Sequence, residues 1–118
     1  MATKANTSVR FRIRVFRGKE ITFGPGKAEL LTHLARTGSL NQAAKRMNMS
    51  YMKAWSMVKL MNQSYKQPLV KAERGGSGGG GAELTDFGRR LLSLYAEMEK
   101  ESLSAVGKPW KEIQKMLK

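Results

Sequence analysis

The feature that most constrains the fold of this chain is a run of six glycines and one serine, Gly75 to Gly81. A strand-like segment, Pro68 to Arg74, precedes the run, and a helical pattern beginning around Leu84 follows it. Two short amphipathic helical patterns come before the strand. The order helix, turn, helix, strand, flexible tip, strand predicts an α+β fold of the winged helix-turn-helix type. A glycine tip can follow a nucleic-acid backbone closely, and its N–H groups can meet phosphate oxygens.

The distribution of charge favours double-stranded DNA as the partner. The 118 residues suit one domain, and 22 Lys and Arg against 9 Asp and Glu give a formal net charge of +13. Residues 1–26 carry six basic and one acidic side chain, residues 27–74 carry nine and two, and residues 75–118 carry seven and six. The excess of basic side chains therefore lies in residues 1–74, the part of the chain that is predicted to contact DNA. Glu97, Glu99 and Glu101, on the last long helical pattern, argue against a membrane-surface protein.

Several classes of protein are disfavoured by what the chain lacks. It contains no cysteine, which excludes disulfides, thiolate catalysis and sulfur-ligated zinc. No apolar stretch approaches the roughly 20 residues that span a bilayer, and residues 1–8 lack the apolar core of a signal peptide, so we expect a cytoplasmic protein. The single histidine, His33, lies in a helical pattern, where a partly buried structural histidine is the commoner case. We expect no enzyme activity, no cofactor and no bound metal.

The N-terminal region predicts a β-hairpin. Residues 1–8 are small and polar and are expected to form a disordered tail. Val9 to Val15 alternates strictly between apolar and basic residues, which predicts a strand with one face of Val9, Phe11, Ile13 and Val15 and another of Arg10, Arg12 and Arg14. A turn at Arg17–Lys19 leads to a returning strand, Glu20 to Phe23. Two interpretations of the arginine row remain open: a solvated edge that discourages strand addition, and a ridge that faces phosphates.

Two helices follow the hairpin. Leu30, Leu31 and Leu34 recur at helical spacing until Gly38, which is typical of a helix C-terminus. Ser39 to Gln42 has the form of a capping box and opens a second helix, which is expected to end near Asn48. The inward side chains of this second helix are Leu40, Ala43, Ala44 and Met47.

The third helix is the predicted recognition helix. Ser50 can cap it, and its core stripe consists of Ala54, Val58, Met61 and Tyr65. Lys53 and Lys59 supply charge near a groove, and Met52 can contact a thymine methyl group. The candidate DNA-binding residues on this helix and on the wing are Ser50, Tyr51, Met52, Lys53, Ser56, Lys59, Arg74, Gly76, Ser77 and Gly78. The residues expected to hold the DNA backbone include Lys45, Arg46 and Lys71.

A long helix, about 85–106, opens at Thr85 or Asp86 and carries two apolar stripes. Phe87, Leu91, Leu94 and Met98 form one stripe, and Leu92, Tyr95 and Val106 form the other. A helix that is apolar on two sides needs two partners, and the simplest second partner is another copy of the chain. The alternative is that both stripes pack inside one monomer. The candidate dimerisation residues are Phe87, Leu91, Leu92, Leu94, Tyr95 and Met98. Residues 9–106 form the predicted DNA-binding domain, and 107–118 a short helix or tail.

The stretch Gly38–Trp55, followed by Met61–Asn62, Pro68–Val70 and Gly75–Thr85, resembles the N-terminal domain of the ModE family of molybdate-responsive transcription regulators. It is similar, more distantly, to the winged helices of LysR-type regulators. The most specific parts are Ser-Tyr-x-x-Ala-Trp at positions 50–55 and the glycine-rich wing, and the resemblance covers roughly residues 9 to 100.

The resemblance implies a homodimer that inserts the helix beginning at Ser50 into the major groove. Tyr51, Lys53 and Ser56 would contact DNA, and the wing around residues 76–80 would contact its backbone. The implied function is a sequence-specific regulator of a partly palindromic operator, linked to molybdenum metabolism. ModE proteins continue into small β domains that bind the oxyanion, and none follows Lys118, so we expect no direct molybdate binding. The alternative that stays open is a non-specific architectural DNA-binding protein.

Overall fold

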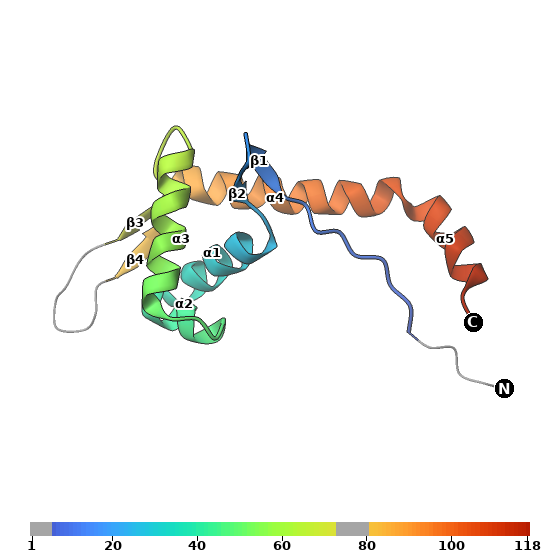
Figure 1. Cartoon of the computed structure of the whole chain (residues 1–118), viewed down its shortest axis with the longest axis horizontal. Helices are drawn as coiled ribbons and strands as arrows, with labels where there is room; N and C mark the ends of the chain where they lie inside the picture. The colour runs from blue at the N-terminus through green and yellow to red at the C-terminus, as the bar shows by residue number, and fades with distance from the viewer. Residues whose placement is uncertain (1–5, 73–80) are drawn as a thin grey trace.

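The computed structural model describes residues 6–72 and 81–118. The elements in chain order are β1 (Val15–Arg17), β2 (Glu20–Phe23), α1 (Pro25–Thr37), α2 (Leu40–Arg46), α3 (Tyr51–Ser64), β3 (Val70–Ala72), β4 (Ala82–Leu84), α4 (Asp86–Ala105) and α5 (Gly107–Met116). β1 pairs with β2, and β3 with β4, in two antiparallel hairpins. Figure 1 shows α1 to α3 and the β3–β4 wing grouped at one end of α4, which then runs away from them to α5. The predicted winged helix-turn-helix is confirmed.

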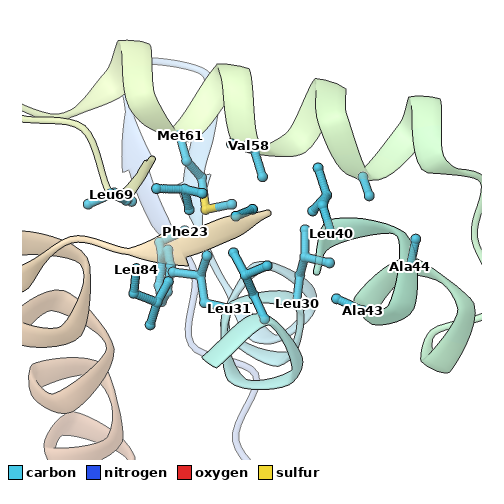
Figure 2. Packing of buried hydrophobic residues seen from close by; sticks show 14 of the residues in the cluster. Phe23, Leu30, Leu31, Leu40, Ala43, Ala44, Val58, Met61, Leu69 and Leu84 are labelled. Carbon is cyan, nitrogen blue, oxygen red and sulfur yellow. The ribbon is translucent and has the colours of Figure 1, made fainter. Parts of the chain in front are cut away.

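The hydrophobic core joins α1, α2 and α3 to both β-hairpins, and these elements together are here called the head. Figure 2 shows Val58 and Met61 pointing from α3 towards Leu30 and Leu31 of α1. Phe23 of β2 lies among them and is fully buried. The further buried apolar residues are Leu34, Leu40, Ala43, Ala44, Ala54, Leu69, Val70, Ala82, Leu84 and Tyr95. Because one core includes residues from every element up to α4, the head is a single packed unit.

The helix boundaries follow the predicted caps. The hydroxyl of Ser39 accepts a hydrogen bond from the N–H of Gln42 at 3.2 Å, and that of Ser50 accepts from Lys53 at 3.1 Å. Thr85 caps α4 through the N–H of Gly88 at 2.9 Å. Gly38 ends α1 in the left-handed region, with φ of 67°. These side chains satisfy N–H groups that the first turn of a helix leaves unpaired, which is why sequence patterns locate the ends well.

The prediction of a strand over Val9 to Val15 is wrong for residues 9–14. Only Val15, Phe16 and Arg17 pair with β2, and Val15 pairs with Phe23 at the end of that strand. Gly24 and Pro25 follow at once and begin α1, so β2 has no further residues to offer a longer partner. Residues 6–14, here called the N-terminal arm, therefore extend beyond the hairpin without a strand partner in the described chain.

The apolar and basic residues of the arm nevertheless alternate in burial, as the sequence pattern predicts. Val9, Phe11 and Ile13 are half-buried, whereas Arg10, Arg12 and Arg14 are exposed. The arm runs past α4 towards α5, as Figure 1 shows. Two hydrogen bonds fasten it there, from the Tyr95 hydroxyl to the Ile13 carbonyl at 2.6 Å and from Gln114 Nε2 to the Thr7 hydroxyl at 2.8 Å.

Candidate nucleic-acid interface

The outer surface of α3 presents the predicted recognition residues together. Tyr51 and Met52 in the first turn are 45% and 68% exposed, and Lys53, Ser56 and Lys59 are also exposed. Solvent-exposed tyrosine and methionine at the start of a helix are unfavourable for folding alone but suit contacts with base edges. The Ser56 hydroxyl donates to the Met52 carbonyl at 3.0 Å, which leaves its oxygen free to accept a hydrogen bond.

The opposite surface of α3 fixes the helix on the head. Ala54, Val58 and Met61 are buried against α1 and α2, as the predicted stripe requires. The small side chains of Ala43 and Ala44 on α2 let the two helices approach closely. The exposed surface of α3 is consequently held by the core of the domain.

The wing is described only at its root. β3 and β4 pair through Val70 with Leu84, and Lys71 is exposed on β3. The N–H of Ala82 donates to the carbonyl of Gly38 at 3.1 Å, which ties the wing to the end of α1. Four of the predicted DNA-binding residues lie outside the described residues: Arg74, Gly76, Ser77 and Gly78.

Asn62 joins the recognition helix to the wing, a role that the sequence patterns did not reveal. Its Oδ1 accepts hydrogen bonds from the N–H groups of Leu69 and Val70 at 2.8 and 3.2 Å, and its Nδ2 donates to the Val70 carbonyl at 3.0 Å. One amide side chain therefore replaces the strand partner that β3 lacks on that side. An asparagine in the last turn of a helix just before a short loop is the only signal in the sequence.

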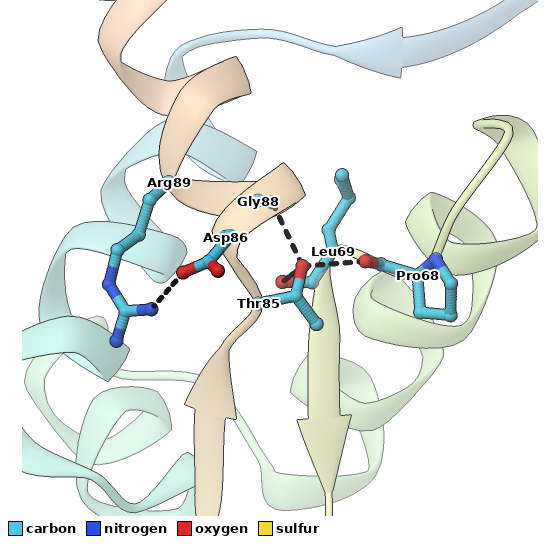
Figure 3. A network of polar contacts seen from close by, with 6 residues as sticks. All are labelled: Pro68, Leu69, Thr85, Asp86, Gly88 and Arg89. Atoms are coloured by element: carbon cyan, nitrogen blue, oxygen red, sulfur yellow. Dashed lines mark hydrogen bonds and ion pairs between the residues drawn. The ribbon is translucent and has the colours of Figure 1, made fainter.

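A second set of contacts connects the start of α4 to Pro68 and Leu69, which precede β3 at the root of the wing. The single hydroxyl hydrogen of Thr85 is shared between the carbonyls of Pro68 and Leu69, at 2.7 and 3.2 Å, while the hydroxyl oxygen accepts from the N–H of Gly88, as Figure 3 shows. The Thr85 N–H also donates to the Leu69 carbonyl, at 3.0 Å. A Cβ atom added to Gly88 would lie 2.2 Å from the Leu69 oxygen, so only glycine allows this approach. Leu84 belongs to β4 and not to the helix, which corrects the helical pattern that included it.

The two stripes of α4 have different surroundings. Tyr95 is only 3% exposed and packs edge-on against Phe23 with ring centroids 5.0 Å apart, and Leu92 packs against the same core. Tyr95 is therefore occupied within one chain and has little surface left for a dimer interface. Leu92 is half-buried and stays a candidate. Leu94 and Met98 of the other stripe are 44% and 45% exposed, and Phe87 and Leu91 are half-buried. Phe87 and Leu91 also pack against the core, so Leu94 and Met98 carry most of the surface that this stripe can offer a partner.

Other chemistry has little support in the described residues. His33 is half-buried, with Nε2 3.6 Å from Glu29 Oε1 on the preceding turn of α1. In residues 6–72 and 81–118, no group of three or more His, Cys, Asp and Glu side chains has the arrangement of a metal site. None of the helices in these ranges is long and apolar enough to cross a membrane.

Comparison with known proteins agrees with this geometry. The family described as "Bacterial regulatory helix-turn-helix protein, lysR family" matches residues 26–89, from the first turn of α1 to the first turn of α4. Among solved structures, "Crystal structure of CbnR_DBD-DNA complex" superimposes with a TM-score of 0.50 at 21% identity, covering 77% of this chain and 94% of that one. This likeness supports the fold.

Curated relatives carry the name ModE. The chain is 37% identical over 102 residues to "Molybdenum transport protein ModE" of Azotobacter vinelandii, covering 85% of this chain and 38% of the relative. It is 46% identical over 71 residues to "DNA-binding transcriptional dual regulator ModE" of Escherichia coli (strain K12), covering 60% of this chain and 27% of the relative. The chain thus spans about a third of the length of these relatives. On the match over α1 to α4, the chain belongs to the bacterial regulatory helix-turn-helix proteins of the lysR family.

Proposed function

We propose that the chain is a sequence-specific DNA-binding transcription regulator that acts as a homodimer. The observation that carries the proposal is the exposed cluster of Tyr51, Met52, Lys53, Ser56 and Lys59 on a helix whose other face is locked into the core. Amphipathic, hydrogen-bonding and cationic side chains grouped in this way suit base edges flanked by phosphates.

The dimer is proposed to form through the exposed stripe of α4. A chain of this length that folded into one compact body would have a radius of gyration of roughly 13.5 Å, but the observed value is 17.8 Å, with a longest extent of 60 Å. Leu94 and Met98 of α4 are 44% and 45% exposed in the described chain. Antiparallel pairing of two such helices would place two recognition helices on one face of DNA, about 34 to 36 Å apart or at a multiple of that spacing.

The regulated process is proposed to be molybdenum metabolism, and the site of action the cytoplasm. The link to molybdenum rests on the names of the curated relatives, whose matches cover 85% and 60% of this chain. We propose no direct molybdate binding by residues 1–118.

Selection of bound fragments from random DNA, followed by competition binding, tests the proposal. A regulator should prefer its selected site by roughly 10³-fold or more over random sequence. A preference of less than tenfold at physiological salt would instead identify an architectural DNA-binding protein.

Two substitutions test which residues contact the bases and which contact the DNA backbone. Lys53→Ala should relax discrimination at one position of the selected site, with a loss of about 1 to 3 kcal/mol there. The matched change Lys71→Ala, on the wing root, should weaken binding to all sequences alike. Equal changes in specificity from both variants would contradict the assignment of α3 as the reading element.

A further inference from the structure

The N-terminal arm holds three arginines without a carboxylate partner. In the described parts of the chain the ion pairs are His33–Glu29, Arg89–Asp86 and Lys115–Glu112, none of which involves the arm. Ile13 packs against the core, and Arg10, Arg12 and Arg14 are exposed on the side of the arm opposite the half-buried residues. The match to the helix-turn-helix family begins at residue 26, so the arm lies outside the matched segment.

The arginine row begins beside the recognition helix. Arg12 and Arg14 line a hollow of about 190 Å³ together with Lys27 of α1 and Met57 of α3. Met57 follows Ser56 directly and lies one helical turn after Lys53. The hollow therefore adjoins the face of α3 that carries Lys53.

Further cations lie at the other end of the arm. Asn6 and Thr7 line a second hollow, of about 790 Å³, with residues of α5 and the end of the chain. Its basic members are Lys108, Lys111, Lys115 and Lys118, and its acidic member, Glu112, lies 3.4 Å from Lys115. Basic residues therefore lie at both ends of the arm, beside α3 and beside α5, and the exposed Arg10 lies between them. Such an arrangement suits a polyanion better than a single small anion.

The position of the arm relative to α4 indicates which part of a polyanion it would meet. Tyr95, whose hydroxyl donates to the Ile13 carbonyl, faces the core, but along the axis of α4 it lies at the level of Leu94 and Met98, the exposed residues of the other stripe. In a two-fold pair built on that stripe, the axis passes near this point. Figure 1 shows the arm, α1 and α2 on the same side of α4, with α3 crossing the N-terminal end of α4. The arms would then lie between the two recognition helices, on the side that faces DNA.

The dimensions of the arm fit that gap. Successive outward side chains on an extended chain are about 6.7 Å apart, so three of them span roughly 13 Å. Two arms therefore cover about 26 Å, which is shorter than the 34 to 36 Å between successive major grooves. Guanidinium groups bind phosphate oxygens in a bidentate manner and carry no information about base sequence at the backbone.

We propose that Arg10, Arg12 and Arg14 form a second DNA site, which binds the phosphates of the spacer between the two half-sites. The proposal rests on the homodimeric DNA-binding function given above. The site would add affinity and salt dependence to binding and leave the choice of sequence to α3.

The test compares the triple variant R10Q/R12Q/R14Q with a charge-matched control, K19Q/K66Q/K100Q. Lys19 and Lys66 lie near the C-terminal end of α3, where Arg17 approaches the Ser64 carbonyl, and Lys100 lies on α4. Binding is measured between 50 and 200 mM salt, on the selected operator with its spacer and on a duplex that contains one half-site alone. On the operator, the arginine variant should bind at least about tenfold more weakly, with a slope of log affinity against log salt lower by roughly 3 to 5. The control should change that slope by less than about 1, and the half-site duplex should show less than a twofold difference between wild type and arginine variant.

Each outcome decides one question. Equal losses on operator and half-site, or equal losses from both variants, would overturn the spacer site. Sedimentation of the arginine variant tests the alternative that the arm contacts the second copy of the chain. A weaker dimer with an unchanged salt slope would show that the arm binds the second copy and not DNA. Thermal unfolding should be the same for both variants, and a loss of DNA binding that only follows unfolding of the arginine variant would also overturn the site. The proposed function is tested separately, and it would be contradicted if the wild-type protein showed no preference for the operator. Even then, the salt slope of the arginine variant on random DNA would still report whether the arm contacts phosphates.

Discussion

Tyr95 shows how one residue can connect parts of the molecule that are distant in sequence. Its ring packs against Phe23, and its hydroxyl donates to the Ile13 carbonyl, 82 positions away. Burial raises the pKa of Tyr95 above its ordinary value of 10.0, with a further rise from Glu99 and an opposing effect from Arg14. The folded state consequently favours the neutral phenol.

This raised pKa predicts a loss of stability in alkaline solution. As the pH rises through about 10, the unfolded chain releases the Tyr95 proton first, so the free energy of unfolding should fall between that pH and the higher pKa of the folded state. Tyr95→Phe should cost about 1 kcal/mol at neutral pH, through the lost hydrogen bond, and should make the alkaline fall shallower. Urea unfolding from pH 8 to 11.5 measures both effects. Tyr51→Phe leaves the Tyr95 hydroxyl in place and should keep the wild-type fall; an identical fall in all three proteins would show that other groups cause it.

At the scale of elements, the joint between α4 and the wing depends on Gly88. Alanine favours an ordinary helix interior by about 1 kcal/mol over glycine, but its Cβ would lie 2.2 Å from the backbone oxygen of Leu69 and force α4 away from β3. Gly88→Ala should therefore lower the free energy of unfolding by about 1 to 3 kcal/mol, as overpacking does, and weaken operator binding. Chemical denaturation gives the first quantity and competition binding the second.

Gly26→Ala is the matched control for this substitution. Gly26 also lies in the first turn of a helix, but a Cβ there would meet no atom within 4 Å. We expect a neutral to slightly stabilising effect, up to about 1 kcal/mol. If Gly88→Ala proved equally harmless, the wing and α4 would not be held by this contact.

At the scale of the whole molecule, the exposed stripe of α4 should control assembly. Leu94→Glu introduces a charge on the stripe at a side chain that is already partly exposed, so the single chain should remain folded. Each dimer would lose two leucine contacts and bury two carboxylates, which should weaken dimerisation by roughly 100-fold or more. Sedimentation equilibrium measures this change. Leu103→Glu makes the same substitution at similar exposure nine residues later, two and a half turns around the helix, and should leave the dimer intact. Equal dissociation by both variants would place the interface elsewhere on α4.

The sequence by itself determined the elements of the head because their signals are local. The caps at Ser39, Ser50 and Thr85, the stop at Gly38 and the helical spacing of apolar residues depend only on neighbours within about four positions. Only the tertiary structure decided how far β1 extends, since that depends on where β2 runs into Pro25.

Only the tertiary structure, likewise, separated the two stripes of α4. Leu94 and Tyr95 are adjacent and both apolar in pattern, but the position of Phe23 buries one and leaves the other exposed. The joints at Asn62 and Gly88 are also invisible to periodicity, because each depends on the backbone of Leu69 lying beside a helix that it does not belong to. Local propensity sets the elements of this protein, and contacts between elements set its surfaces.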